Sequence, residues 1–199
     1  MLRTSAPLIG ALGFTRHIEV PWVEEIMSSS FVRSTIDLFV TRLTTLENLV
    51  TSGEAHLAEG AKQYLSRRLA PDMYPLGTQI AFTCNQPRNF ALWLKGRHSS
   101  DLDPDVRSLE TALRYIHDTK GLLLECSAPD QGLPSDKNLD LEPGLHADLT
   151  GHQYVSEFLV PNFYFHLVTS YAILRMAGVP VGKRDYMAHL LPHVKQSET

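Results

Sequence analysis

Apolar side chains recur at helical spacing near the start of the chain. From Phe31 to Val50 most of them lie three or four positions apart: Phe31, Ile36, Phe39, Leu43, Leu46 and Val50. This pattern predicts an amphipathic helix of about five turns. Ser52-Gly53-Glu54 interrupts the pattern, so we expect a second, shorter helix from Ala55 to Leu69.

Two further helices are predicted from their end signals. Pro75 suits the first turn of a helix and Gly96 suits a C-terminal stop, so we expect a helix between them that kinks or restarts at Pro87. Asp103-Pro104 has the form of a capping carboxylate followed by a proline at the first helical position. We therefore expect the next helix to begin there and to run toward Leu123.

The last predicted helix runs from Pro161 to Ala177 and is closed by Gly178. It contains almost no charge, which predicts burial on most sides. A long loop rich in Pro, Gly, Asp and Leu precedes it, from Ser127 to about His152, and we expect this loop to be functional or to act as a covering flap. With no evident series of strands, the pattern predicts an all-α bundle.

Composition narrows the class of protein. The chain has 199 residues, 43% of them hydrophobic, which favours one globular domain. A net charge of −4 argues against a nucleic-acid-binding protein, and no run approaches the length of a membrane span. The two cysteines, Cys84 and Cys126, do not have the spacing of metal ligands and favour a reducing compartment.

Residues 1–26 differ from the rest of the chain. Arg3 and Arg16 precede the first acidic residue, Glu19, as in a mitochondrial transit peptide. A first helix, a disordered tail and an upstream extension before Met27 are the alternatives. We divide the chain into this extension, a helical domain at 27–190 and a polar tail at 191–199. The expected location is the cytoplasm, or mitochondria if the extension is a transit peptide.

Three polar residues stand out at positions predicted to face inward. Asn162 and His166 lie four residues apart on one face of the most apolar helix, and Gln79 lies between Leu76 and Ile80. A buried polar group without a partner costs about 1–3 kcal/mol. Either these three side chains satisfy one another or the backbone, or they form a site of the kind that helical bundles build in their cores.

Other candidates are less distinctive. Tyr74 and Tyr171 are candidates to line a pocket and donate phenolic hydrogen bonds, although core packing is the default for both. His146, in the long loop, is either an acid/base group or a solvated side chain. Cys84 is expected to be a small buried residue rather than a nucleophile.

Two blocks of the sequence resemble an uncharacterised branch of the DinB/YfiT-like superfamily. They are Ala70-Pro71-Asp72-Met73-Tyr74-Pro75-Leu76 with Gln79, and Val160-Pro161-Asn162-Phe163-Tyr164-Phe165-His166 with the following Ala172-Ile173-Leu174-Arg175, Gly178-Val179 and Gly182-Lys183. The resemblance covers roughly Phe31 to Tyr186. It implies a DinB-like up-down four-helix bundle with a long loop before the last helix, and a homodimer.

The resemblance also implies a divalent metal ion, because better-known relatives bind one through three histidines. By position these ligands correspond to Gln79, Asn162 and His166, so only His166 keeps an imidazole. Two neutral amides make a weak donor set for zinc or nickel. A weakly held ion completed by Asp72, by His146 or by Asp148 is one alternative.

These observations favour an enzyme that acts on a small molecule without a redox cofactor, by isomerisation, dehydration or cyclisation. His166 would act as general acid or base, and Gln79 and Asn162 would orient the substrate and stabilise negative charge. Tyr74, Tyr171 and His146 would contact the substrate. The resemblance keeps open a metal-dependent thiol transferase or isomerase, and the third alternative is a non-catalytic ligand-binding or dimerisation module.

Overall fold

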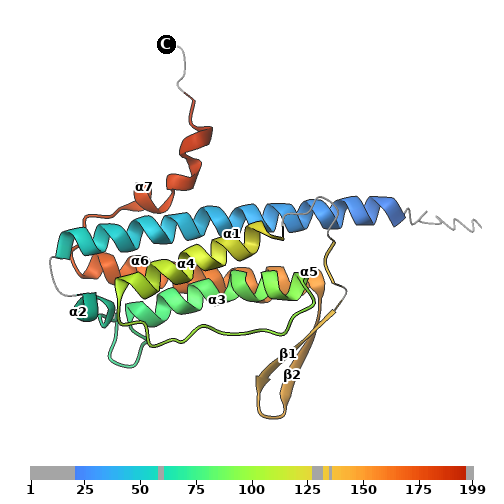
Figure 1. Cartoon of the computed structure of the whole chain (residues 1–199), viewed down its shortest axis with the longest axis horizontal. Coiled ribbons are helices and arrows are strands. Elements are labelled where there is room, and N and C mark those ends of the chain that lie inside the picture. Colours follow the sequence, from blue (N-terminus) through green and yellow to red (C-terminus); the bar gives the residue numbers. More distant parts are fainter. Residues whose placement is uncertain (1–20, 58–60, 127–131, 135, 196–199) are drawn as a thin grey trace, which may run out of the picture.

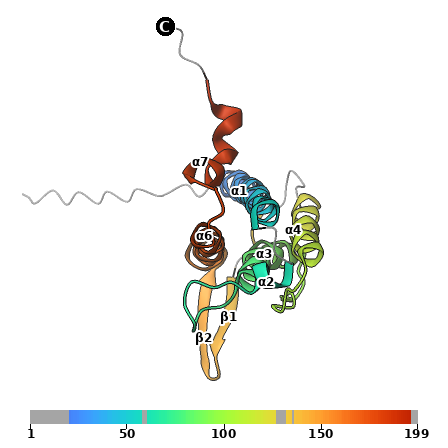
Figure 2. The same cartoon turned by 90° about the vertical axis from the view of Figure 1, so that its left-hand side faces the viewer.

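Four long helices form the body of the protein. The computed structural model describes residues 21–57, 61–126, 132–134 and 136–195, so the predictions for residues 1–20 lie outside it. The long helices are α1 (Pro21–Leu57), α3 (Leu76–Leu94), α4 (Leu109–Leu124) and α6 (Val160–Met176). α1 and α3 each contact both α4 and α6, and Figure 2 shows the four helices grouped end-on. The mostly helical fold is as predicted.

Shorter elements connect and extend these helices. They are α2 (Ala61–Leu65), the strands β1 (Asp136–Glu142) and β2 (Leu145–Thr150), α5 (Gly151–Gln153), the π-helix η1 (Tyr154–Leu159), α7 (Lys183–Tyr186) and the 3-10 helix η2 (Ala188–His193). Figure 1 shows β1 and β2 extending from one side of the helices and the C-terminal segment from the other.

The helix directions correct the predicted up-down order. Residues 95–108 run back along α3, because Ser100 contacts Asn89, Leu102 contacts Asn85 and Pro104 contacts Thr78. α4 therefore begins beside the start of α3 and ends beside its end, where the Cys126 thiol donates to the Ala91 carbonyl oxygen. α3 and α4 are parallel to each other, and residues 95–108 form a crossover connection of the kind some bundles contain.

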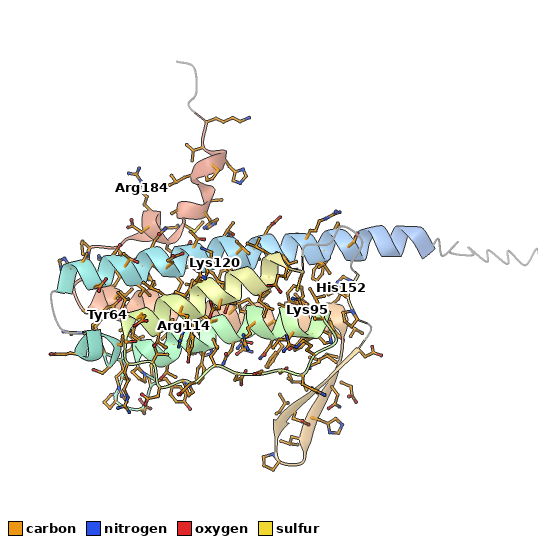
Figure 3. All side chains as sticks on the ribbon, viewed as in Figure 1. Tyr64, Lys95, Arg114, Lys120, His152 and Arg184 are labelled. Atoms are coloured by element: carbon orange, nitrogen blue, oxygen red, sulfur yellow. The ribbon has the colours of Figure 1, made fainter. Side chains whose placement is uncertain are left out.

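The predicted break at Ser52-Gly53-Glu54 is wrong, because α1 continues through it to Leu57. A Cβ atom at Gly53 would overlap the side chains of Tyr64 and Leu174. The Tyr64 hydroxyl donates to the Val50 carbonyl oxygen (2.9 Å), which fixes its ring against this position. Gly53 therefore provides close packing rather than a helix end; Tyr64, a residue of α2, is labelled in Figure 3.

The ends of α3 and α6 are close to those predicted. α3 begins directly after Pro75, continues through Pro87 and is followed by Gly96, which has a positive φ of 65°. Gly178, with a φ of 89°, follows α6 in the same way. A left-handed residue after the last turn is the usual helix stop, and glycine adopts it without steric cost.

The predicted helix start at Asp103-Pro104 is wrong. The Asp103 carboxylate accepts a hydrogen bond from the Asp105 backbone N–H (2.9 Å), which makes a local turn. α4 begins later, where the Ser108 hydroxyl accepts from the Thr111 backbone N–H (3.1 Å). Asp103 has the right residue type for a cap, but its carboxylate is used by the crossover segment.

The long loop before α6 contains a β-hairpin, which corrects the all-α prediction. β1 and β2 are antiparallel, with Lys137 opposite Leu149 and Asn138 opposite Asp148, and Gly144 in the turn has a φ of 84°. The Asn138 side-chain amide donates to the Asp148 carboxylate (2.6 Å). Leucines at alternate positions favour extended strands. Most of this Pro- and Gly-containing segment therefore forms two strands, joined by one tight turn.

The hydrophobic core lies between the four long helices. The ring of Phe39 on α1 packs edge-on against Phe90 on α3 (5.8 Å between centroids) and Phe163 on α6 (5.0 Å). At the surface, Lys120 on α4 pairs with Glu47 on α1 (3.0 Å). Among the described residues, no helix combines the length and apolar character that crossing a membrane requires.

Replacing Gly53 by alanine is expected to destabilise the protein by about 1–3 kcal/mol, because the added methyl group overpacks the contact with Tyr64 and Leu174. Gly121→Ala is the matched control. A Cβ atom at Gly121, on an exposed part of α4, meets no neighbouring atom, so this variant should be neutral or up to about 1 kcal/mol more stable. Urea unfolding measures both changes, and equal stability of the two variants would contradict the packing role of Gly53.

Candidate functional site

A chain of hydrogen bonds joins α3 to α6 through two of the predicted site residues. The Gln79 Nε2 amide donates to the backbone carbonyl oxygen of Tyr74 (3.3 Å), and Gln79 Oε1 lies 2.8 Å from His166 Nδ1. A carbonyl oxygen only accepts, so the amide nitrogen must face Tyr74 and the amide oxygen must face His166. His166 Nδ1 therefore carries the proton, which leaves Nε2 as the acceptor nitrogen of the ring.

The two helices hold this chain rigidly. Gln79 lies in the first turn of α3, where its backbone N–H bonds to the Pro75 carbonyl oxygen, and its side chain is only 2% exposed. The His166 ring is flanked edge-on by Phe82 (5.1 Å) and Phe165 (5.2 Å). A hydrogen-bonded amide on one side and aromatic rings beside the imidazole fix its orientation.

Burial changes the protonation of His166. Desolvation disfavours the charged imidazolium and lowers the pKa of His166 to about 4. At neutral pH the ring is therefore uncharged, and among the described residues its one ring hydrogen bond is that of Nδ1, so the unprotonated Nε2 has no partner there. This nitrogen is available to accept a proton or a hydrogen bond from a bound molecule.

His166 lines a cleft with a volume of about 480 Å³. The cleft lies between α3, η1, α6, the crossover segment and strand β1. Its apolar lining includes Leu139 and the aromatic residues Phe82, Tyr154 and Phe158. The rings of Tyr154 and Phe158 are nearly parallel, with centroids 5.9 Å apart. A cleft with aromatic side chains and one acceptor nitrogen suits a small, partly apolar organic molecule.

Other residues that line the cleft are polar. The Asn89 side-chain amide donates to the Asp101 carboxylate (2.9 Å), and Asn85 Oδ1 accepts from the Leu102 backbone N–H (2.9 Å). Lys137 on β1 places its ammonium 5.4 Å from the centroid of the Tyr154 ring. The cleft therefore combines amides, one ammonium and carboxylates around an aromatic floor.

Sequence reasoning missed most of these lining residues. Phe82, Asn85, Gln86 and Asn89 line the cleft from α3, at spacings of three and four residues that put them on one helical face. This spacing could have indicated a polar site from the sequence alone, because the side-chain amides of Asn85, Gln86 and Asn89 share the face. Nothing in the sequence indicated that the crossover segment and β1 would cover it.

The remaining predicted residues lie elsewhere. The Asn162 amide donates to the Phe158 carbonyl oxygen in its own helical segment (2.9 Å), and Asn162 does not line the cleft. Tyr74 is 60% exposed and contributes its backbone carbonyl rather than its hydroxyl. Tyr171 lines a separate apolar pocket with Val168. His146 is exposed on β2, with its Nε2 3.9 Å from the Asp148 carboxylate.

Two other residues have ordinary structural roles. Cys84 is fully buried, as predicted, and desolvation raises the pKa of its thiol, so it is no thiolate nucleophile. His152, labelled in Figure 3 beside the end of the hairpin, is exposed and its ring packs on Phe31 (4.5 Å).

The side chains at the three expected metal-ligand positions do not fit a histidine-type metal centre. Gln79 Oε1 is engaged by His166 Nδ1, and the Asn162 amide is bonded to the backbone. Within the described part of the chain, no group of three or more His, Cys, Asp or Glu side chains is arranged to hold a metal ion. His166 would be the one strong neutral donor among the three positions.

Comparisons with known proteins agree with the predicted resemblance. Residues 31–187 match the model of a domain of unknown function, DUF1993. The chain is similar to the crystal structure of a DinB family member protein from Shewanella denitrificans, with a TM-score of 0.66 and 25% sequence identity. That similarity covers 81% of this chain and 93% of the other. No curated protein matches the chain.

Titration of His166 by NMR tests the hydrogen-bond chain. We expect the imidazole to stay neutral, with the proton on Nδ1, until the pH falls to about 4. Gln79→Glu should raise the pKa of His166 by about 1–3 units, because a carboxylate beside the ring favours the imidazolium.

Gln79→Met is the uncharged control. It should leave the pKa low, because burial is the cause, but it should remove the preference for a proton on Nδ1. The arrangement would be refuted if Gln79→Glu left the pKa of His166 unchanged.

Proposed function

Because this chain belongs to the DUF1993 family, whose domain has no assigned function, we propose its function from the cleft beside His166. We propose an enzyme that moves a proton on a small organic molecule without redox change. Isomerisation, dehydration and ring closure are the reactions of this class. His166 is the general base that takes the proton and the general acid that returns it.

The observation that carries this proposal is the hydrogen-bond chain from Tyr74 through Gln79 to His166. A catalytic base needs a defined tautomer, a fixed orientation and access to the reacting group. Gln79 supplies the first two by accepting from Nδ1, and the cleft supplies the third at Nε2. A merely structural histidine would have no need of an accessible second nitrogen.

The proposed proton transfer follows from the burial of His166. Nε2 takes a proton from the substrate, and the imidazolium is held by the hydrogen bond from Nδ1 to Gln79 Oε1. Because desolvation disfavours this charged ring, it returns the proton readily to another atom of the substrate. Such a base is weak, so the substrate must carry an acidic proton or form a stabilised anion.

The proposed site contains fewer residues than the site predicted from the sequence. We keep His166 and Gln79, and we keep Tyr74 only through its backbone carbonyl. Asn162, Tyr171 and His146 have no proposed role, because they do not line the cleft with His166. We also interpret the four long helices as a DinB-like four-helix bundle, an interpretation supported by the TM-score of 0.66. A homodimer stays a prediction.

The proposed enzyme predicts a clear effect of His166→Ala. Turnover of an identified substrate should fall by about 10²–10⁴-fold, which is the usual contribution of a general acid or base. In the unaltered enzyme, kcat/KM should be constant from weakly acidic to weakly alkaline pH and should fall as the pH approaches about 4, because protonation removes the base. Proton NMR in D₂O against a panel of oxo acids, ketones and hydroxy acids finds the substrate and measures the rate.

Tyr171→Phe is the matched control, because Tyr171 lies in a different pocket and its loss should leave turnover unchanged. Turnover that survives in His166→Ala, with the fold intact by circular dichroism, would overturn the assignment.

A metal-dependent thiol transferase or isomerase is the second candidate, because the chain resembles a DinB family member. The poor fit of Gln79 and Asn162 as ligands argues against this candidate. We expect natively purified protein to carry no stoichiometric zinc, nickel, manganese or iron in elemental analysis. One such ion per chain, lost in His166→Ala and retained in Tyr171→Phe, would instead favour the metal-dependent enzyme.

A further inference from the structure

Asn85 on α3 has an unused hydrogen-bond donor in the cleft. Its side chain is 4% exposed, and its Oδ1 accepts from the backbone N–H of Leu102 (2.9 Å). A backbone N–H only donates, so the amide oxygen must face Leu102 and the Nδ2 amino group must face the other way. Asn85 lines the cleft, and among the described residues the one hydrogen bond of its side chain is the one that Oδ1 accepts, so its Nδ2 has no acceptor there.

This donor and the His166 acceptor belong to residues that line the same cleft. Asn85 follows Gln79 by six residues on α3, which is about 9 Å along the helix axis. Phe82 lies between them, lines the cleft and contacts the His166 ring (5.1 Å). Both groups therefore line one cleft of about 480 Å³, which is large enough for a carbonyl compound with a planar apolar group beside the aromatic side chains.

Building on the proposed function, we propose that Asn85 is a second catalytic residue and that the substrate is a planar carbonyl compound with an acidic C–H next to the carbonyl. Asn85 Nδ2 donates to the carbonyl oxygen while His166 Nε2 takes the adjacent proton. The C–H electron pair becomes the carbon–carbon double bond, and the carbonyl π pair moves to oxygen as an enolate. The proton then returns to carbon or to oxygen, so no oxidant or reductant is needed.

The pairing of a weak base with a donor is chemically consistent. Bases of pKa near that of an ordinary carboxylic acid remove protons next to a carbonyl when hydrogen-bond donors hold the developing oxyanion. A preorganised amide is such a donor. Asn85 is preorganised because the crossover segment fixes its oxygen, so its amino group does not reorient during the reaction.

The test is exchange of the C–H protons of 2-indanone, an uncharged planar ketone, followed by NMR in D₂O. Asn85→Asp keeps an oxygen for the Leu102 N–H but replaces the donor by an acceptor, and should slow exchange by about a hundredfold or more. Gln86→Glu is the matched control, because it adds the same charge to the same helical face without removing the Asn85 donor. Because Gln86 also lines the cleft, this charge should slow exchange too, but at least tenfold less than Asn85→Asp does.

The outcomes separate the two proposals. Equal losses in Asn85→Asp and Gln86→Glu would overturn the donor role of Asn85, because charge alone would explain them. Exchange that needs His166 but is unchanged in Asn85→Asp would overturn it while leaving the proposed function intact. Turnover of another substrate class that needs His166, with no exchange of carbonyl compounds, would overturn the substrate class alone. Exchange that survives His166→Ala would overturn the proposed function itself.

A measurement on the unaltered protein covers the case in which Asn85→Asp does not fold. In spectra of the side-chain amides, the Asn85 amino protons should shift when 2-indanone is added. The Asn162 amide donates to the Phe158 carbonyl oxygen, does not line the cleft and should shift little. An unchanged Asn85 signal at saturating ketone would overturn the contact.

Discussion

The need to satisfy the buried polar side chains of α3 determines how the rest of the chain is arranged around that helix. α3 is buried along most of its length, yet it carries Thr78, Gln79 and Asn85 in buried positions. A buried polar group without a partner lowers the stability of the protein by about 1–3 kcal/mol. Each of these side chains has a partner outside the interior of α3, and these partners hold the crossover segment, the turn at Tyr74 and α6 against the helix.

Two of these partners belong to the crossover segment. Asn85 accepts from the Leu102 N–H, and Thr78 donates to the Pro104 carbonyl oxygen (2.9 Å), so residues 99–106 lie along α3. This segment returns the chain to the start of α3 and makes α4 parallel to it. The same amides that hold the crossover also line the cleft, so fold stability and the shape of the candidate site depend on one set of hydrogen bonds.

Features of the fold could be predicted from the sequence where a residue's own backbone preference determines them, and not where a contact with a distant residue does. Pro75 and Gly178 mark helix ends through their own backbone preferences, and both predictions are confirmed. Gly53 misled the prediction because its role is a contact with Tyr64 and Leu174, which only the assembled fold reveals. The hairpin had a local signal in Pro143-Gly144 between alternating leucines, but loop composition outweighed it.

Only some residues of the candidate site could be predicted from the sequence, for the same reason. Gln79 and His166 stood out because a polar residue in an apolar helical stripe needs a partner, and they are partners of each other. Asn162 stood out equally but is satisfied by the helical backbone one turn earlier. Periodicity identifies which side chains need partners, whereas only packing decides which partner each one finds. Asn85 differs because only its oxygen is engaged, and the donor left over is what gives a structural amide a chemical use.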